Sequence, residues 1–210
     1  GALSVYKYKE LGYLSEAFNN YLMRLGWGYK DQEIFSIRQA ISLFNLRNIG
    51  KSPSRFDNNK LNHLNSFYIK KIETNQLANL INFKKLFNGK DYEKVNKLVL
   101  LFRERTENLN VLQEGLSYML NEYNEHYTEF AINMLHKTKP SIKTNLIKEF
   151  NKLNKWDSKN IQLLVKRISA DFNVKIFDIA APLRAAVTGQ QFSPSIFTIL
   201  EILGKETTLK

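Results

Sequence analysis

The sequence predicts an all-α protein, on the basis of three observations. Apolar residues recur every three or four positions over most of the 210 residues, which is the repeat of one helix face. The 9 glycines and 4 prolines fall between these periodic segments. No five-residue run alternates clearly enough between apolar and polar side chains to predict a strand. We therefore expect a succession of helices joined by short polar loops.

Three helices are predicted in the first third of the chain, and their expected ranges are 14–25, 31–44 and 60–72. Gly26 stops the first helix, Asp31 is the expected N-cap of the second, and Asp57 is the candidate cap of the third, which follows a loop. The side chains expected to face inward are Leu14, Phe18, Tyr21, Leu22, Leu25, Ile34, Ile37, Ala40, Ile41, Phe44, Leu61, Leu64, Phe67, Tyr68 and Ile72.

Further helices are expected over 91–105, 109–120, 141–153, 158–172 and 194–203, with a polar interruption at 104–110. The last helix has the best-defined ends. Ser193 is its expected N-cap, Pro194 its first residue and Gly204 its stop. The inward side chains are expected to be Tyr92, Val95, Leu98, Val99, Phe102, Leu109, Leu112, Leu116, Met119, Leu120, Ile196, Phe197, Ile199, Leu200 and Leu203.

The positive net charge of the chain indicates which class of partner it binds. The formal net charge is +11 and the pI is about 9.6, which favours a polyanion: nucleic acid first, an acidic membrane second. A general enrichment in lysine is the competing explanation. The absence of cysteine excludes disulfides and thiolate chemistry and favours a reducing, cytoplasmic location. The sequence has no apolar run long enough to span a membrane and no export signal at its N-terminus.

The residues do not assemble a recognisable active site. None of the histidines His63, His126 and His136 has a second histidine three or four positions away, so no metal site is expected. The acidic residues are scattered on lysine-rich and arginine-rich helices, where ion pairs explain them better than acid–base catalysis. The segment 50–52 reads GKS, but Asn45 stands where a phosphate-binding loop needs glycine. We therefore expect no catalytic residue in this chain.

Binding through basic side chains is the remaining expectation. The basic clusters lie at Arg47–Lys60, Lys70–Lys71, Lys84–Lys85 and Lys137–Lys159. Two arginines also lie near expected helix ends: Arg105 at a polar turn, and Arg184 in an apolar segment that leads to Gly189. An arginine held at such a position can read a splayed RNA base. An internal salt bridge, or a favourable charge at a helix C-terminus, is the alternative for both.

Five stretches together carry a family resemblance. In chain order they are "GALSV…YKELGYLSEAFNNYLMRLGW" (1–27), "DQEIFS" (31–36), "FDNNKLNHLN" (56–65), "RERTENL" (103–109) and "PLRAAVTG…SPSIFTILEILGKETTL" (182–209). They resemble bacterial glutamyl-tRNA synthetase, a class I aminoacyl-tRNA synthetase. Its catalytic fold carries a HIGH-type and a KMSKS-type motif, and this sequence contains neither. The chain resembles the C-terminal half that follows the second motif, so ATP and Mg²⁺ would belong to the catalytic half.

The resemblance implies an organisation and a set of contacts. Residues 1–70 would be a helical stem-contact region, and 71–124 and 125–210 two helical anticodon-binding subdomains. The contacts expected at the anticodon are Arg105, Arg184, Ser193, Pro194, Ile196 and Phe197, with Lys60 expected near the tRNA stem. Three positions depart from the usual pattern: Ser15 stands where proline is common, His63 where tryptophan is common, and Ser193 where threonine is common. The smaller imidazole weakens the expectation for Lys60.

The implied function is to bind the anticodon arm of tRNA(Glu) without aminoacylating it, inside a glutamate–tRNA ligase that uses ATP. The tRNA(Gln) is a second candidate partner. We expect no membrane and no DNA partner, no cofactor in this chain, and a monomer. Two alternatives remain open from the residues alone. They are a stand-alone helical RNA-binding module, and a helical protein-interaction scaffold whose charge is incidental.

Overall fold

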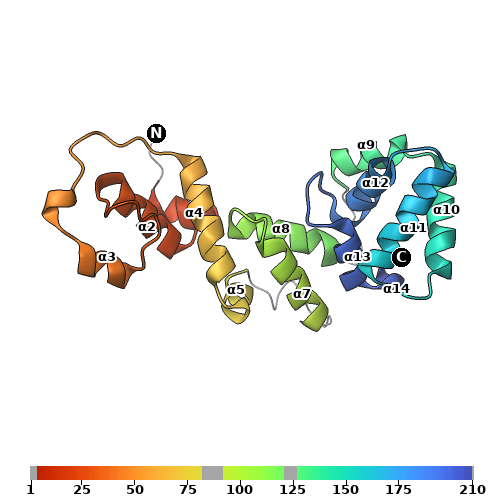
Figure 1. Ribbon diagram of the computed structural model, residues 1–210, viewed down its shortest axis with the longest axis horizontal. Coiled ribbons are helices and arrows are strands. Elements are labelled where there is room, and N and C mark those ends of the chain that lie inside the picture. The colour runs from red at the N-terminus through yellow and green to blue at the C-terminus, as the bar shows by residue number, and fades with distance from the viewer. Residues whose placement is uncertain (1–3, 82–91, 121–126, 210) are drawn as a thin grey trace. The chain divides into compact units, whose positions relative to one another are not determined.

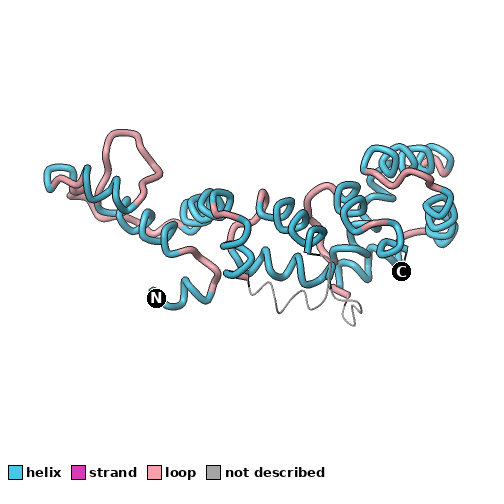
Figure 2. The backbone as a smooth tube through the Cα atoms, turned by 90° about the horizontal axis from the view of Figure 1, so that it is seen from below, coloured by secondary structure: helices cyan, strands magenta, loops and turns pink. Residues whose placement is uncertain are grey.

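The computed structural model describes residues 4–81, 92–120 and 127–209, and every regular element in these ranges is a helix, which confirms the all-α prediction (Figure 2). The chain divides into two compact units (Figure 1). The first comprises 1–84 and 103–113, and the second 85–102 and 114–210. The sequence-predicted boundaries at 70 and 124 stay predictions. The features expected at Gly1–Leu3, Lys84–Lys85, Asp91 and His126 lie outside the described residues.

The first unit is built around the packing of two long helices. Its elements are α1 (Val5–Glu10), α2 (Ser15–Gly26), α3 (Ile37–Leu43), η1 (Leu46–Asn48), α4 (Asn58–Lys71), α5 (Thr74–Leu80) and the first turn of α8 (Leu109–Leu120). Phe18 and Tyr21 of α2 pack on Leu61 and Leu64 of α4, as the spacing predicts. Asp57 caps α4 as expected, because its carboxylate accepts the backbone N–H groups of residues 59 and 60.

A buried asparagine joins three distant parts of the first unit. The Asn65 side chain, which is 0% exposed, accepts the Leu14 N–H at 2.8 Å and donates to the Glu107 carbonyl at 2.6 Å. Beside it, the Gly12 carbonyl accepts the Leu109 N–H at 3.0 Å. Gly12 has a φ of +83°, and a Cβ there would lie 2.9 Å from the Leu109 nitrogen, so only glycine fits. Residues 12–14, 65 and 107–109 therefore form one hydrogen-bonded junction.

The prediction of a helix over 31–44 is wrong at its N-terminal end. The helix α3 begins only at Ile37, and its N-cap is Ser36 rather than Asp31. Ser36 and Gln39 form a reciprocal capping box, in which each side chain bonds the other residue's backbone N–H. The capping box therefore marks the start of the helix at Ser36, and the preceding residues lie outside it.

Some side chains expected inside the protein are exposed, and they are Leu22, Ile37, Ile41, Phe44 and Tyr92. Three of them belong to α3 or its C-cap. That helix buries none of its residues, so its apolar face is left uncovered in this structure. The periodicity had predicted that this face packs on a core. The side chain of Leu120, also expected inward, lies outside the described side chains.

The second unit is a cluster of helices around α11. Its elements are α7 (Tyr92–Arg103) up to residue 102, the rest of α8, α9 (Glu129–Lys137), α10 (Pro140–Lys152), α11 (Ser158–Asp171), α12 (Ile176–Thr188), α13 (Ile196–Leu203) and α14 (Lys205–Leu209). The helix α11 packs on α10, α12 and α13 and buries Ile161, Val165 and Ile168. Trp156 fixes the α10–α11 loop to α13, because its indole N–H donates to the Leu200 carbonyl at 2.8 Å.

The last long helix does not begin where the sequence predicts. The helix α13 starts at Ile196 with Ser195 as its N-cap, so Ser193 is not the cap and Pro194 is not the first helical residue. The hydroxyl of Ser193 is engaged elsewhere, as shown below. The helices α1, α5, α9 and α14 were not predicted, and α12 continues through Pro182, where an apolar segment of undefined structure was expected.

Candidate nucleic-acid interface

The C-terminal end of α12 is closed by a glycine that is tied to another helix. Gly189 has a φ of 64°, the left-handed conformation that commonly ends helices. Its carbonyl accepts the Thr128 hydroxyl at 2.6 Å. The same Thr128 hydroxyl accepts the Ala131 N–H and so caps α9. The loop that follows α12 therefore starts from a fixed point at the beginning of α9.

Arg184 lies on α12, one turn before this end, and its side chain is half-buried. Its Nε donates to the Ser193 Oγ at 3.0 Å. Ser193 is 8% exposed, and its hydroxyl donates in turn to the Pro194 carbonyl at 3.0 Å. In the described ranges, Arg184 forms no ion pair. The serine thus orients the guanidinium without neutralising it, which leaves the charge available to an anion or a base edge.

Five of the predicted contact residues lie together here, but three of them, Ser193, Pro194 and Ile196, are buried. Arg184, Ser193 and Pro194 adjoin one another, and Phe197 is half-buried on the first turn of α13. Ile196 is only 1% exposed because its side of α13 packs into the core of the second unit. Its side chain is therefore not offered to a ligand in this structure, which corrects that prediction.

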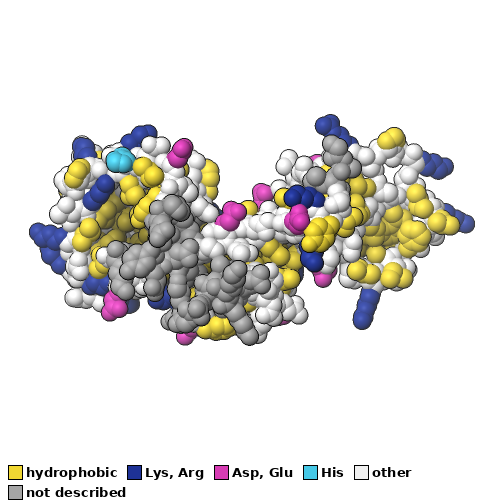
Figure 3. All heavy atoms as spheres, turned by 180° about the vertical axis from the view of Figure 1, so that it is seen from behind, with side chains coloured by type: hydrophobic (Ala, Val, Ile, Leu, Met, Phe, Trp, Pro, Cys, Tyr) yellow, Lys and Arg dark blue, Asp and Glu magenta, His cyan; other side chains and the backbone are white. Residues whose placement is uncertain are grey.

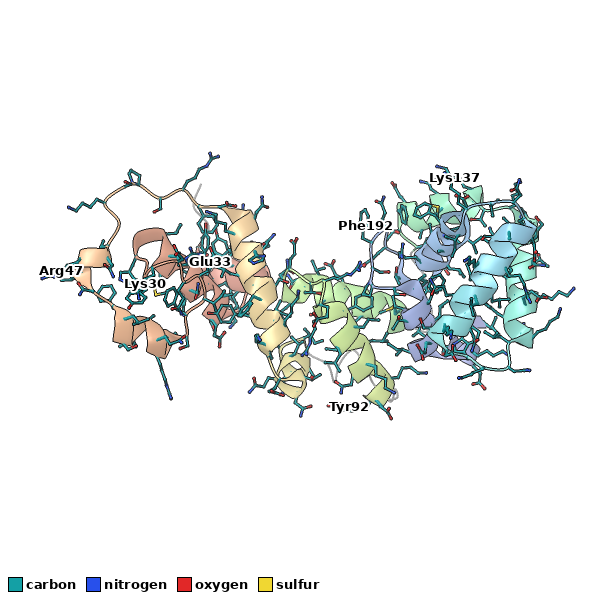
Figure 4. The ribbon with its side chains drawn as sticks, viewed as in Figure 1. Lys30, Glu33, Arg47, Tyr92, Lys137 and Phe192 are labelled. Carbon is teal, nitrogen blue, oxygen red and sulfur yellow. The ribbon has the colours of Figure 1, made fainter. Side chains whose placement is uncertain are left out.

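One exposed aromatic residue at this site was missed by the sequence reasoning. Phe192 is 80% exposed on the loop between α12 and α13, directly before Ser193 (Figure 4). An apolar residue between predicted helices gave no signal of its own. The signal that could have found it is its context, because it stands among polar and turn-forming residues rather than in an apolar period.

Arg105 and Lys60 belong to the first unit. Arg105 is exposed in the turn between α7 and α8, next to the buried Thr106. Lys60 is exposed in the first turn of α4 and lines a cleft of about 490 Å³. The other residues that line this cleft are Tyr21, Arg24, Leu25, Glu33, Ser54, Arg55, Asn59, His63 and Leu64.

The charge in the cleft is mainly positive. Its one carboxylate, Glu33, pairs with Arg24 at 3.0 Å. Arg55 and Lys60 have no such pair in the part of the chain that the structure describes. A pair of uncompensated cations in a cleft suits a phosphate group.

The basic segment 137–159 of the second unit contains two carboxylates that hold cations of their own. A hydrogen bond from Lys152, followed by the charges of nearby cations, lowers the pKa of Glu149 below its ordinary value. The backbone N–H of Asn160 lowers the pKa of Asp157 in the same way. On the face shown in Figure 3, lysine and arginine side chains are spread over the surface rather than gathered in one patch. This surface can attract a polyanion, but by itself it specifies no sequence.

A metal-binding cluster and a membrane-spanning helix are both absent from the described residues. No group of three or more His, Asp or Glu side chains there comes close enough together to hold a metal ion. None of the described helices combines the length and the hydropathy that crossing a bilayer requires.

Two family models match the chain. The anticodon-binding domain matches residues 66–210, and the catalytic domain of class I tRNA synthetases for E and Q matches residues 2–63. The second match covers the segment that carries Lys60 and the cleft. The first covers Arg105, Arg184 and the loop with Phe192.

Curated relatives and solved structures give the same grouping. Glutamate–tRNA ligase 2 of Rickettsia akari is 36% identical over 214 residues, and that of Rickettsia typhi 39% identical over 219; both alignments cover 100% of this chain and 46% of the relative. A crystal structure of a glutamate tRNA ligase from Elizabethkingia meningosepticum, in complex with its amino acid, has a TM-score of 0.76 and 25% identity over 96% of this chain and 41% of that one. The chain thus spans less than half the length of these relatives.

Proposed function

Because this chain belongs to the glutamate–tRNA ligase family of class I synthetases, we propose that it binds the anticodon arm of tRNA(Glu). The observation that carries this proposal is the Arg184 site. A charged guanidinium is aimed by Ser193, forms no ion pair in the described residues, and lies within the matched anticodon-binding domain. Arginine donors at fixed positions read the edges of unpaired bases in RNA. The net charge of +11 provides the long-range attraction.

The roles of the two arginines and of the cleft differ in this proposal. Arg184 and Arg105 read bases of the anticodon, and Arg105 bears on the choice between tRNA(Glu) and tRNA(Gln). Arg55 and Lys60 contact phosphates of the tRNA body through the cleft of the first unit. Ligation of glutamate, with ATP and Mg²⁺, is the activity proposed for the whole protein. This chain lacks the HIGH-type and KMSKS-type motifs, so we expect it to bind tRNA without charging it.

The experiment that tests the proposal is a binding titration of the chain with tRNA(Glu) transcripts, both native and anticodon-substituted, at two salt concentrations. We expect binding that weakens with salt and also with each anticodon change. Arg184→Ala should weaken binding by about 1–3 kcal/mol, the discrimination that a good base contact provides. Arg105→Gln should relax the preference at one anticodon position more than it lowers overall affinity.

Controls separate base reading from simple charge attraction. Lys137→Ala removes an exposed cation at the end of α9, and should lower affinity equally for all anticodons. Lys60→Ala should weaken binding of whole tRNA but not of an isolated anticodon hairpin. Binding that depends on salt and ignores the anticodon would reject base reading. Binding of a protein partner that is insensitive to salt, with no affinity for RNA, would instead favour a protein-interaction scaffold.

A further inference from the structure

Phe192 has the highest exposed fraction, 80%, of the large apolar side chains in the described residues. Single exposed apolar residues are common and usually need no explanation. On a flexible loop, an exposed phenylalanine ring would pack against the nearest apolar surface. The exposure of Phe192 is informative only if the loop that carries it cannot move the ring inward.

The residues around Phe192 are held in place on both sides. On one side, the Gln190 N–H donates to the Thr188 hydroxyl at 3.3 Å, and the Gly189 carbonyl accepts Thr128. On the other side, Ser193 is buried and bonded to Arg184. The exposed ring thus projects from a segment whose neighbours are fixed. Because this segment is already ordered, less conformational entropy is lost when the ring binds a ligand.

Phe192 also lies next to the one arginine of this site. The Cα atoms of Phe192 and Ser193 are about 3.8 Å apart, as in any trans peptide. The Arg184 guanidinium is 3.0 Å from the Ser193 hydroxyl. An exposed aromatic ring therefore comes from the residue directly before the serine that holds the Arg184 guanidinium. Proteins that bind unpaired RNA bases combine these two elements, with stacking on the ring and hydrogen bonds at the base edge.

We propose that Phe192 is a stacking platform for one unpaired nucleobase, whose edge or neighbouring phosphate is contacted by Arg184. This inference rests on the proposed function and adds a base-stacking residue to it. The ring accepts any base by stacking, so it contributes affinity and position, and the arginine contributes the choice of base. The half-buried Phe197 then serves as the floor of the site, and the buried Pro194 and Ile196 support it from the core.

The test uses the 210-residue chain and three anticodon hairpin RNAs, each with a fluorescent pyrimidine analogue at one anticodon position. Stacking on an aromatic ring quenches such an analogue. We expect quenching at one position with the wild-type chain. Phe192→Leu, which keeps the apolar character and loses the aromatic face, should abolish the quenching and weaken binding about 5- to 150-fold, the range for one stacked base. Phe192→Trp should retain both the quenching and the binding affinity, because it keeps an aromatic face.

Matched variants distinguish the possible failures. Phe44→Leu makes the same chemical change at an exposed phenylalanine of the first unit and should alter neither signal. If Phe192→Leu binds and quenches like the wild type while Arg184→Ala loses affinity, the stacking role is rejected and the proposed function survives. If the wild-type chain binds none of the hairpins, both proposals fail together.

Discussion

Replacement of Asn65 by leucine should destabilise the first unit strongly, although the two side chains have similar volumes. The substitution leaves the buried Leu14 N–H and the partly buried Glu107 carbonyl without their present partner, which lies at 2.8 and 2.6 Å. An unsatisfied buried backbone group costs about 1–3 kcal/mol, so the loss should be about 2 kcal/mol or more, most of it from the Leu14 N–H, because water can reach the Glu107 carbonyl. A domain's entire stability is typically about 5–15 kcal/mol. Loss of the Asn65 amide would therefore remove a large share of the free energy of unfolding of this unit.

The two tryptophans make this loss measurable unit by unit. Trp27 is buried in the first unit and Trp156 belongs to the second. In a Trp156→Phe background, urea unfolding followed by fluorescence reports on the surroundings of Trp27 alone. With an m value of about 2 kcal/mol/M, Asn65→Leu should lower the midpoint by about 1 M or more.

Asn62→Leu is the matched control for this prediction. Asn62 lies one turn earlier on α4. It donates to the Glu107 carboxylate at 2.8 Å and accepts the Tyr13 hydroxyl, but it is only half-buried, so water can replace these bonds. Its loss should shift the midpoint by much less than the loss of Asn65. Equal midpoints for the Asn65 variant and the wild type would refute the reasoning, because they would mean that the junction contributes no net stability.

Three other predictions concern the second unit, the site and pH. Gly115→Ala should fail to stabilise α8, despite a helix-propensity gain of about 1 kcal/mol, because the new Cβ would lie 3.1 Å from the buried Phe102 ring; a rise in melting temperature would contradict this. Ser193→Ala should weaken hairpin binding by on the order of 1 kcal/mol while leaving the melting temperature almost unchanged, because it frees the Arg184 side chain and Ser193 is not at the N-cap position of α13; a cooperative loss of structure would assign Ser193 a structural role instead. Burial, and secondarily a nearby carboxylate, raises the pKa of Tyr68 above its ordinary value of 10.0, so the folded state favours the neutral phenol. The stabilisation that the neutral Tyr68 phenol provides is complete below pH 10 and declines as the pH rises through the raised pKa. The difference in free energy of unfolding between wild type and Tyr68→Phe should therefore narrow above pH 10. A difference that stays constant in melts from pH 8 to 11 would show that the phenol is not involved.

The helical class and much of the core were predictable because they depend on local periodicity. Phe18, Leu61, Val95 and Leu112 recur at helical spacing and are buried. The capping of α4 by Asp57 was also readable, since a short acidic side chain before a periodic run is a local signal.

The start of α3 was missed because a distant side chain decides it. Asn20 of α2 accepts the Phe35 N–H at 2.6 Å and donates to the Glu33 carbonyl at 2.9 Å. These bonds hold the backbone before Ser36 outside the helix. The Ser36–Gln39 spacing of a capping box was nevertheless present in the sequence and pointed to the correct start.

The candidate site shows the same division between local and distant causes. The sequence indicated that Arg184 and Ser193 matter, but it assigned the serine to a helix cap. Its hydroxyl bonds Arg184 instead, across nine positions of the chain, and α13 begins two residues later than predicted. Likewise, the burial of Ile196 follows from how α13 packs on α11, which no local pattern encodes.

The junction at Asn65 has a consequence for how the protein is made. Residues 4–81 leave the ribosome before 103–113, and synthesis proceeds at about 5–20 residues per second. Until the later segment emerges, the Asn65 amide lacks the Glu107 carbonyl and the Gly12 carbonyl lacks the Leu109 N–H. The first unit can therefore be completed only after the chain has begun the second. A gene divided at the border between the two matched family domains would separate Gly12 from the 107–109 segment, although both belong to one folding unit.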